Sequence, residues 1–240
     1  MLHAASRGNP SAPRPRLLVA GATGVLGNEV LRRLAGSSLF SFTQVLAREP
    51  ITAGLRGVGV TLVPPEEPAA WPPGAADVAV VLFEPARLFY DRERALWTPR
   101  PEQLVPLARW LRASGVRTLA VVLPHAPGRL PDALKRGLAN LDEHAVAGLG
   151  FERVLLLRSA RKPDPVAGLG RPQRFAHWML SVFKYMIPSS EQPVRACRVA
   201  DFLAVALQLA PPGTHVAAPE VLWEATQGPL EPVARRWLGA

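Results

Sequence analysis

The chain has 240 residues, of which 48% are hydrophobic and 20% are charged, and its formal net charge is +9. These values exclude a wholly disordered chain and allow one domain with a substantial core. The single cysteine, Cys197, excludes an internal disulfide, and no apolar run reaches the roughly 18 residues that span a bilayer. We therefore expect a soluble, cytoplasmic protein without a membrane partner.

The positive charge comes almost entirely from arginine, because the only lysines are Lys135, Lys162 and Lys184. The arginines are scattered and have no aromatic residues interleaved with them, which disfavours a nucleic-acid partner. Residues 1–15 are basic and lack the apolar run of a secretory signal. We expect a flexible tail there and one domain over residues 16–240.

Short apolar runs alternate with helical patterns, as in a parallel sheet covered by helices. Strands are expected at residues 16–21, 42–47, 59–64, 76–83, 116–124 and 152–160. Helices are expected at residues 25–34, 101–115, 130–150, 174–186 and 196–210, before a last short strand and helix within 214–225. The pattern predicts an α/β, Rossmann-like doubly wound parallel sheet, with a small C-terminal helical cap from about residue 161 onward.

A glycine-rich segment joins the first expected strand to the first expected helix: Gly21-Ala22-Thr23-Gly24-Val25-Leu26-Gly27. Gly21 permits a tight turn, Gly24 lets the backbone approach a pyrophosphate, and Gly27 lets the helix pack closely on the strand. The free N–H groups at the start of the helix would then face the phosphates. A structural turn without a ligand is the alternative, but the strand–turn–helix context favours dinucleotide binding.

The stretches "LLVAGATGVLGNEVLRRL", "DVAVVLFEP" and "RASGVRTLAVVLPHA" resemble the atypical and extended short-chain dehydrogenases/reductases. Within that superfamily the chain is most similar to the NmrA-like and TIP30-like NAD(P)-binding proteins, over roughly Arg16 to Glu224. The resemblance implies that NAD(P) binds to the glycine-rich segment. It also places Phe83 and Glu84 beneath the adenosine and the nicotinamide ribose, and Lys135 at the family's lysine position.

The residue after the second strand distinguishes the two nicotinamide dinucleotides in this fold. Here it is Arg48, whose guanidinium could pair with the 2′-phosphate of NADP. Glu49 follows directly and weakens the signal, and Arg48 could also be an ordinary surface residue. We predict NADP(H), with NAD(H) as the alternative.

The enzymes that this chain resembles use a serine and a tyrosine–lysine pair spaced YxxxK, in which the lysine helps to lower the tyrosine pKa. That pair is missing here, because neither Tyr90 nor Tyr185 has a lysine four residues later. Lys135 falls at the family's lysine position, but Pro131 stands where the tyrosine belongs. Lys135 could hold the nicotinamide ribose or could be a solvated helix residue. His125, after the fifth strand, is a weak candidate for a replacement proton donor.

No group of His, Cys or acidic residues has metal-ligand spacing, so no metal is predicted. Cys197 is expected in the core. The preferred interpretation is a cofactor-binding sensor, regulator or scaffold that would act on a protein partner, with a degenerate active site. The alternative is an NAD(P)H-dependent oxidoreductase or isomerase that acts on a small carbonyl compound with non-standard acid–base groups. A homodimer stays open.

Overall fold

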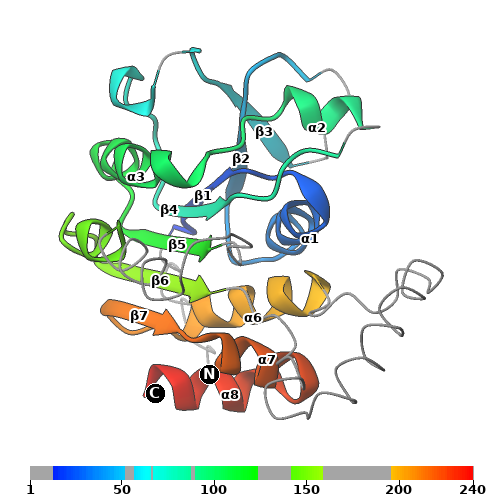
Figure 1. The fold of residues 1–240 in the computed structure, drawn as a ribbon, viewed down its shortest axis with the longest axis vertical. Coiled ribbons are helices and arrows are strands. Elements are labelled where there is room, and N and C mark those ends of the chain that lie inside the picture. The colour runs from blue at the N-terminus through cyan, green and yellow to red at the C-terminus, as the bar shows by residue number, and fades with distance from the viewer. Residues whose placement is uncertain are drawn as a thin grey trace, which may run out of the picture.

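Seven parallel strands form one sheet in the described part of the chain (Figure 1). The computed structural model describes residues 13–51, 57–65, 67–87, 90–123, 142–158 and 196–239. The strand order is β3-β2-β1-β4-β5-β6-β7. The strands are β1 (Arg16–Ala20), β2 (Phe42–Ala47), β3 (Val58–Leu62), β4 (Val78–Leu82), β5 (Thr118–Leu123), β6 (Arg153–Arg158) and β7 (Gly213–Ala217).

The order reverses between β1 and β4, which are hydrogen-bonded neighbours. In open α/β sheets, ligands bind beyond the carboxyl ends of the strands at this switch point. The predicted doubly wound sheet is confirmed, and every expected strand from β1 to β6 is present within two residues of its predicted ends.

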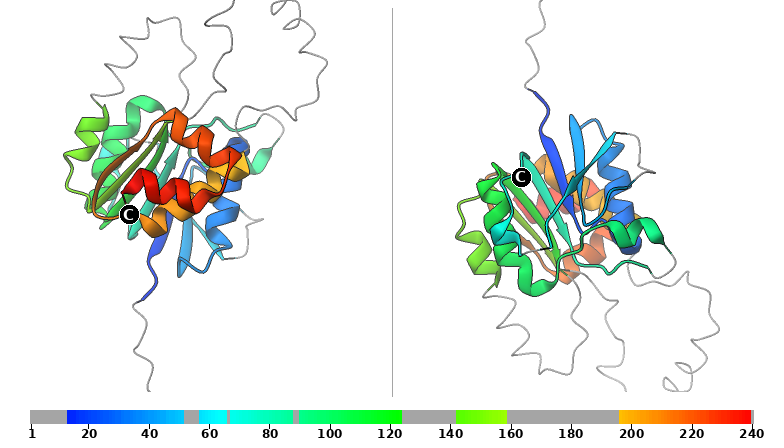
Figure 2. Two further views of the ribbon diagram at one scale, coloured as in Figure 1. Left: turned by 90° about the horizontal axis from the view of Figure 1, so that it is seen from below. Right: turned by 90° about the horizontal axis from the view of Figure 1, so that it is seen from above.

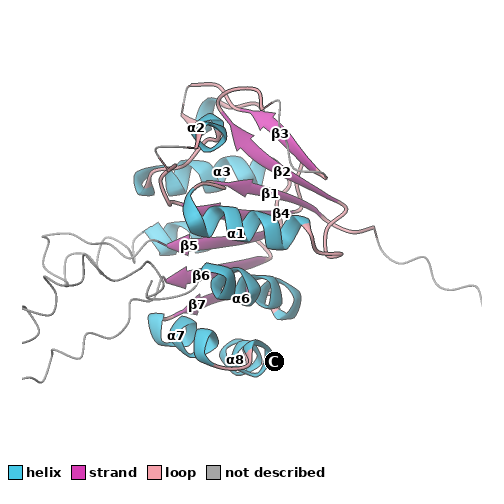
Figure 3. Cartoon of the chain, turned by 90° about the vertical axis from the view of Figure 1, so that its right-hand side faces the viewer, coloured by secondary structure: helices cyan, strands magenta, loops and turns pink. Residues whose placement is uncertain are grey.

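Helices cover both faces of the sheet (Figures 2 and 3). On one face lie α1 (Gly24–Ala35), α6 (Ala196–Leu209), α7 (Pro219–Gln227) and α8 (Leu230–Leu238). On the other lie α3 (Leu104–Ala113) and a helix over residues 142–147. The short helix α2 (Asp91–Ala95) and the 3-10 turns Pro68–Ala70 and Pro101–Gln103 lie in the connections around β4 and α3.

Successive side chains along the central strands point to opposite faces of the sheet, and this divides the core into two layers. Leu17 and Val19 of β1 belong to the layer beneath α1 and α6, whereas Leu18 and Ala20 belong to the layer beneath α3. All four side chains are at most 1% exposed. Burial of a large aliphatic side chain stabilises a fold by about 1.5–3 kcal/mol. These two layers therefore hold β1 in place, and with it the start of the glycine-rich segment.

The C-terminal helices pack directly on the sheet and on α1. Phe202 of α6 is fully buried, and the guanidinium of Arg33 on α1 lies 2.8 Å from the carboxylate of Asp201. Cys197, expected in the core, is exposed. That prediction was wrong because Cys197 lies in the first turn of α6, before the buried positions that begin at Val199.

The sequence did not predict α2 or α8. The helix expected at 174–186 lies outside the described residues, as does the first part of the one expected at 130–150. Among the helices that are described, none is long and apolar enough to cross a membrane.

Candidate functional site

The glycine-rich segment makes a tight turn between β1 and α1. Gly21 has a φ of 79°, and a Cβ at this position would lie 2.0 Å from the carbonyl oxygen of Leu82. Gly24 has a φ of 69°. Gly27 allows a close approach, because a Cβ there would lie 2.6 Å from the carbonyl oxygen of Gly21. Larger residues would therefore be strained or excluded at this turn, as the sequence predicted.

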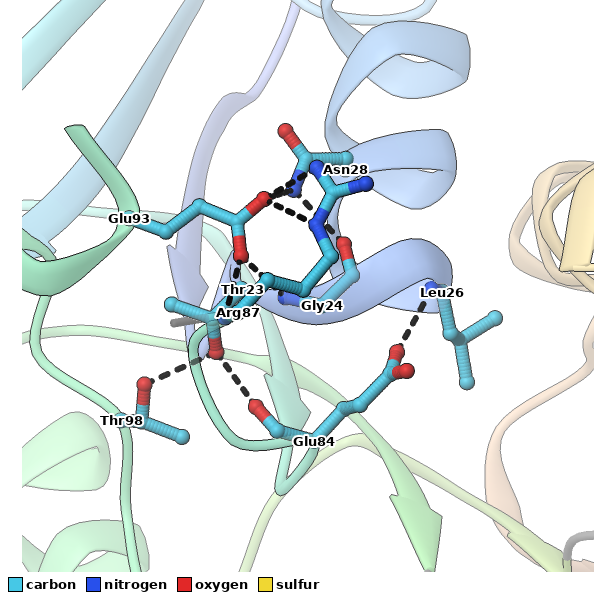
Figure 4. A network of polar contacts seen from close by, with 8 residues as sticks. All are labelled: Thr23, Gly24, Leu26, Asn28, Glu84, Arg87, Glu93 and Thr98. Carbon is cyan, nitrogen blue, oxygen red and sulfur yellow. Dashed lines mark hydrogen bonds and ion pairs between the residues drawn. The ribbon is translucent and has the colours of Figure 1, made fainter. Parts of the chain in front are cut away.

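The first turn of α1 receives its caps from distant parts of the chain. The N-cap residue, Thr23, makes no side-chain cap hydrogen bond, and the first turn contains no acidic residue. Instead, the Gly24 N–H donates to Oε2 of Glu93 at 3.0 Å, and the Leu26 N–H donates to Oε2 of Glu84 at 2.6 Å (Figure 4). We call these two N–H groups the loop mouth. Both bind anionic oxygen at the positive end of the helix dipole.

The Glu93 carboxylate is buried and held by many hydrogen bonds. Its side chain is 2% exposed, and its carboxylate accepts five hydrogen bonds from three residues. Arg87 donates from its backbone N–H and from its guanidinium, with which Glu93 forms an ion pair. Asn28 donates from Nδ2 at 2.7 Å and ties Glu93 to the second turn of α1. A buried carboxylate with this many donors is a fixed part of the fold.

The surroundings of Glu93 keep it ionised. Burial disfavours the charged carboxylate, but the hydrogen bonds from Arg87 and Gly24, together with the charge of Arg87, outweigh that cost and lower the pKa of Glu93 below its ordinary value. Glu93 therefore holds a negative charge beside the loop mouth throughout the neutral pH range.

Glu84 is held much more loosely. Its side chain is partly exposed, and among the described residues its carboxylate has one hydrogen bond, the one from Leu26. The carboxylate lies in the space that a side chain at Gly24 would take, since a Cβ there would be 2.2 Å from Cδ of Glu84. The backbone of Glu84 is better anchored, because its carbonyl accepts a hydrogen bond from the buried hydroxyl of Thr23, which also lies 2.8 Å from the hydroxyl of Thr98.

The segment after α2 crosses the carboxyl ends of β1 and β2. The Trp97 N–H donates to the Leu46 carbonyl at 2.9 Å, and the Trp97 carbonyl accepts from the Gly21 N–H at 3.2 Å. The Arg48 N–H donates to the Ala95 carbonyl at 2.8 Å. The segment that delivers Glu93 is therefore fastened to the strand ends that flank the loop mouth.

Comparisons with known proteins were made by sequence and by structure. No protein-family model and no curated protein matches the chain. Among solved structures, a nucleoside-diphosphate-sugar epimerase from Staphylococcus aureus matches 85% of this chain and 70% of its own, with a TM-score of 0.53 and 11% identity. MoeE5 in complex with UDP-glucose and NAD matches 84% of this chain and 74% of its own, with a TM-score of 0.50 and 16% identity.

The chain shares the Rossmann-like fold of these two proteins. The resemblance seen in the sequence is thus confirmed for the fold. The glycine-rich segment lies between β1 and α1, as the sequence predicted, and the structure adds that β1 pairs with β4 at the switch point of the sheet.

The structure brings together some of the residues predicted to bind a cofactor. Glu84 reaches the loop mouth, and Phe83, at the end of β4, is partly buried against the layer beneath α3. Arg48 lies exposed after the end of β2. Lys135 and His125 lie outside the described residues. The cofactor contacts of all these residues stay predictions.

Sequence reasoning missed Glu93, which binds the Gly24 N–H of the loop mouth, and Arg87, which binds Glu93. They lie in "ARLFYDRERALW", which the sequence indicates as a loop after the fourth strand. Their only signal is an acidic residue in a short helix that follows the fourth strand. Within the described residues, no group of three or more His, Cys, Asp or Glu is arranged to hold a metal ion.

Proposed function

We propose that this chain binds a nicotinamide dinucleotide at the loop mouth, with NADP(H) preferred over NAD(H), and that it acts as a cofactor-binding sensor or scaffold. The observation that carries this proposal is the state of the Gly24 and Leu26 N–H groups. Both already bind carboxylate oxygens, at 3.0 and 2.6 Å. An N–H group at a helix start that binds anionic oxygen can also receive a phosphate oxygen, and of these two the Leu26 N–H has the more loosely held partner.

A structural neighbour supports the choice of ligand class. MoeE5, which shares this fold, is described in complex with UDP-glucose and NAD. In open sheets with such a reversal of strand order, dinucleotides bind beyond the carboxyl ends of the strands, beside the turn between β1 and α1.

Arg48 supports the preference for NADP(H). Its side chain is exposed at the carboxyl end of β2, where the adenosine ribose of a dinucleotide lies in Rossmann folds. A guanidinium can bind two oxygens of a 2′-phosphate at once, whereas it offers little to the 2′-hydroxyl of NAD.

The regulatory part of the proposal rests on the missing proton donor. Tyr90 is followed four residues later by Arg94, whose guanidinium pairs with Asp91 at 2.6 Å. The guanidinium of Arg87 lies 3.8 Å from the centre of the Tyr90 ring. Tyr90 therefore has no lysine one turn away, and dehydrogenases that resemble this chain need that lysine to activate their phenol.

Calorimetric titration with NADPH and NADH tests the proposal. We expect saturable binding of both, with NADPH bound more tightly. Arg48→Ala should weaken NADPH binding about tenfold and leave NADH binding unchanged, as expected for one charge-assisted contact. Arg109→Ala, which removes an exposed arginine from α3, is the matched control.

Absorbance of the reduced nicotinamide, followed with aldehydes, ketones and quinones, tests the regulatory part. We expect binding without turnover. Absence of heat with either dinucleotide would overturn dinucleotide binding, and turnover above background would overturn the sensor in favour of an oxidoreductase.

A further inference from the structure

We infer that the Glu84 carboxylate is an internal competitor for the loop mouth, which occupies the Leu26 N–H until an anionic ligand displaces it. This inference rests on the proposed function, because it concerns regulation of the same site. It follows from a difference between the two carboxylates that share the first turn of α1.

The difference lies in how each carboxylate is held. Glu93 is 2% exposed and accepts five hydrogen bonds, so its removal would break the contacts from Gly24, Arg87 and Asn28 together. The carboxylate of Glu84 is partly exposed and has the Leu26 N–H as its one donor in the described residues. Rotation of the Glu84 side chain into solvent breaks that single hydrogen bond and otherwise weakens only the attraction between its charge and that of Arg87. Glu84 can therefore leave, whereas Glu93 stays.

The backbone at Glu84 makes this rotation local. The Glu84 carbonyl is tied to the hydroxyl of Thr23, which is itself fully buried and lies beside Thr98. The main chain after β4 is thus fixed to the glycine-rich segment while the side chain remains free to turn. Figure 4 shows the carboxylate reaching the Leu26 N–H from this anchored backbone.

The space that Glu84 occupies is the space that a phosphate needs. Its carboxyl group lies where a Cβ on Gly24 would be, within 2.5 Å of that position, and it bonds an N–H of the first turn. A pyrophosphate on the same N–H would meet the carboxylate both as a competitor for the hydrogen bond and as a like charge. Ligand binding therefore requires the Glu84 side chain to move away.

Removal of this competitor should tighten the binding of anions. Glu84→Ala removes both the occupant and its charge. We expect inorganic pyrophosphate and NADPH each to bind at least about tenfold more tightly, because neither ligand then has to break the charge-assisted hydrogen bond between Leu26 and Glu84. Glu84→Gln removes the charge but keeps an acceptor for Leu26, so its gain should be smaller. Glu231→Gln, on an exposed pair of α8, is the control for net charge.

The experiment measures dissociation constants of inorganic pyrophosphate and of NADPH for the full chain and the three variants, and records the amide resonance of Leu26 during each titration. A tenfold gain for Glu84→Ala, a smaller gain for Glu84→Gln, no change for Glu231→Gln and a saturable shift at Leu26 would support the inference. Equal pyrophosphate affinity for the full chain and Glu84→Ala would overturn it.

The two ligands separate this inference from the proposed function. If Glu84→Ala gains pyrophosphate affinity at Leu26 but no form of the chain binds NADPH, the competitor is supported and the dinucleotide function fails. If NADPH binds equally to the full chain and to Glu84→Ala, the dinucleotide function stands and the competitor is overturned.

Discussion

The carboxylates at the two edges of the sheet differ in how deeply they are buried. At the carboxyl edge, a carboxylate that is 2% exposed and another that is partly exposed bind backbone N–H groups of α1. At the amino edge, a surface depression is lined by Arg16 and Arg117, whose exposed guanidinium groups lie 3.9 and 3.8 Å from the carboxylate of Asp77, which also accepts a hydrogen bond from the Arg16 N–H. Exposed ion pairs like those at the amino edge are screened by solvent. The contacts between carboxylates and the N–H groups of α1 should therefore contribute more to stability and to ligand choice.

The largest expected loss of stability follows a substitution in the turn between β1 and α1. Gly21→Ala should destabilise the fold by about 3 kcal/mol or more, because it combines a positive φ with a Cβ placed 2.0 Å from the Leu82 carbonyl. Gly150→Ala is the matched control, since Gly150 has a φ of 77° and a Cβ added there would meet nothing within 4 Å. We expect it to cost about 1 kcal/mol. Urea denaturation of both variants measures the difference, and equal losses would show that the close approach at Gly21 is unimportant.

The next effect concerns Glu93. Glu93→Gln should lower the free energy of unfolding by about 2–3 kcal/mol, because it weakens charge-assisted hydrogen bonds to a buried group and leaves Arg87 without its ion pair. Glu231→Gln, in an exposed pair with Arg235, should change it by less than about 0.5 kcal/mol. Chemical denaturation at neutral pH compares them, and a loss at Glu93 no greater than at Glu231 would contradict a structural role for the buried carboxylate.

A smaller effect should appear in how the stability of the chain changes at acid pH. The pKa of Glu93 lies below its ordinary value of 4.5 in the folded chain, so the unfolded chain takes up the proton first as pH falls. The stabilisation is fully present above about pH 4.5 and is lost as the pH falls through the lowered folded pKa. Thermal unfolding between about pH 6 and pH 3 should therefore show a shallower loss for Glu93→Gln than for Glu231→Gln. Parallel curves would refute the lowered pKa.

The smallest effect is expected at the amino edge. Glu152 and Arg153 form a pair at 3.0 Å, but both side chains are about a third or more exposed. Glu152→Gln should lower the free energy of unfolding by at most about 0.5 kcal/mol, and about 0.5 M NaCl should remove the difference. A salt-independent loss above about 1 kcal/mol would mean that the amino edge resembles the carboxyl edge after all.

The parts of the molecule that the sequence predicted are those with a local signal. Buried strands such as Val78–Leu82 are continuous apolar runs, and the three glycines of the turn stand together in one short segment between a strand and a helix. Arg48 was placed correctly at the end of β2 because its position depends only on the strand before it. Its contact with a 2′-phosphate stays a prediction.

The contacts of the loop mouth could not be predicted because they join distant residues. Leu26 and Glu84 are 58 positions apart, and Gly24 and Glu93 are 69 positions apart. Both contacts depend on how the segment after β4 folds back over the strand ends, where α2 has only five residues. A helix that short has no periodicity to reveal it, and tertiary hydrogen bonds decide its position. The sequence therefore predicted the N–H groups but not the carboxylates that occupy them.

The most direct test is a crystal structure of the chain grown with saturating NADPH, in which the distance from the Leu26 backbone nitrogen to the nearest phosphate oxygen is measured. We expect a phosphate oxygen at about 2.7–3.2 Å from that nitrogen, with the Glu84 carboxylate turned away and Glu93 still bound to Gly24. A structure in which the Glu84 carboxylate remains on Leu26 and no dinucleotide lies at the loop mouth would contradict the proposed site.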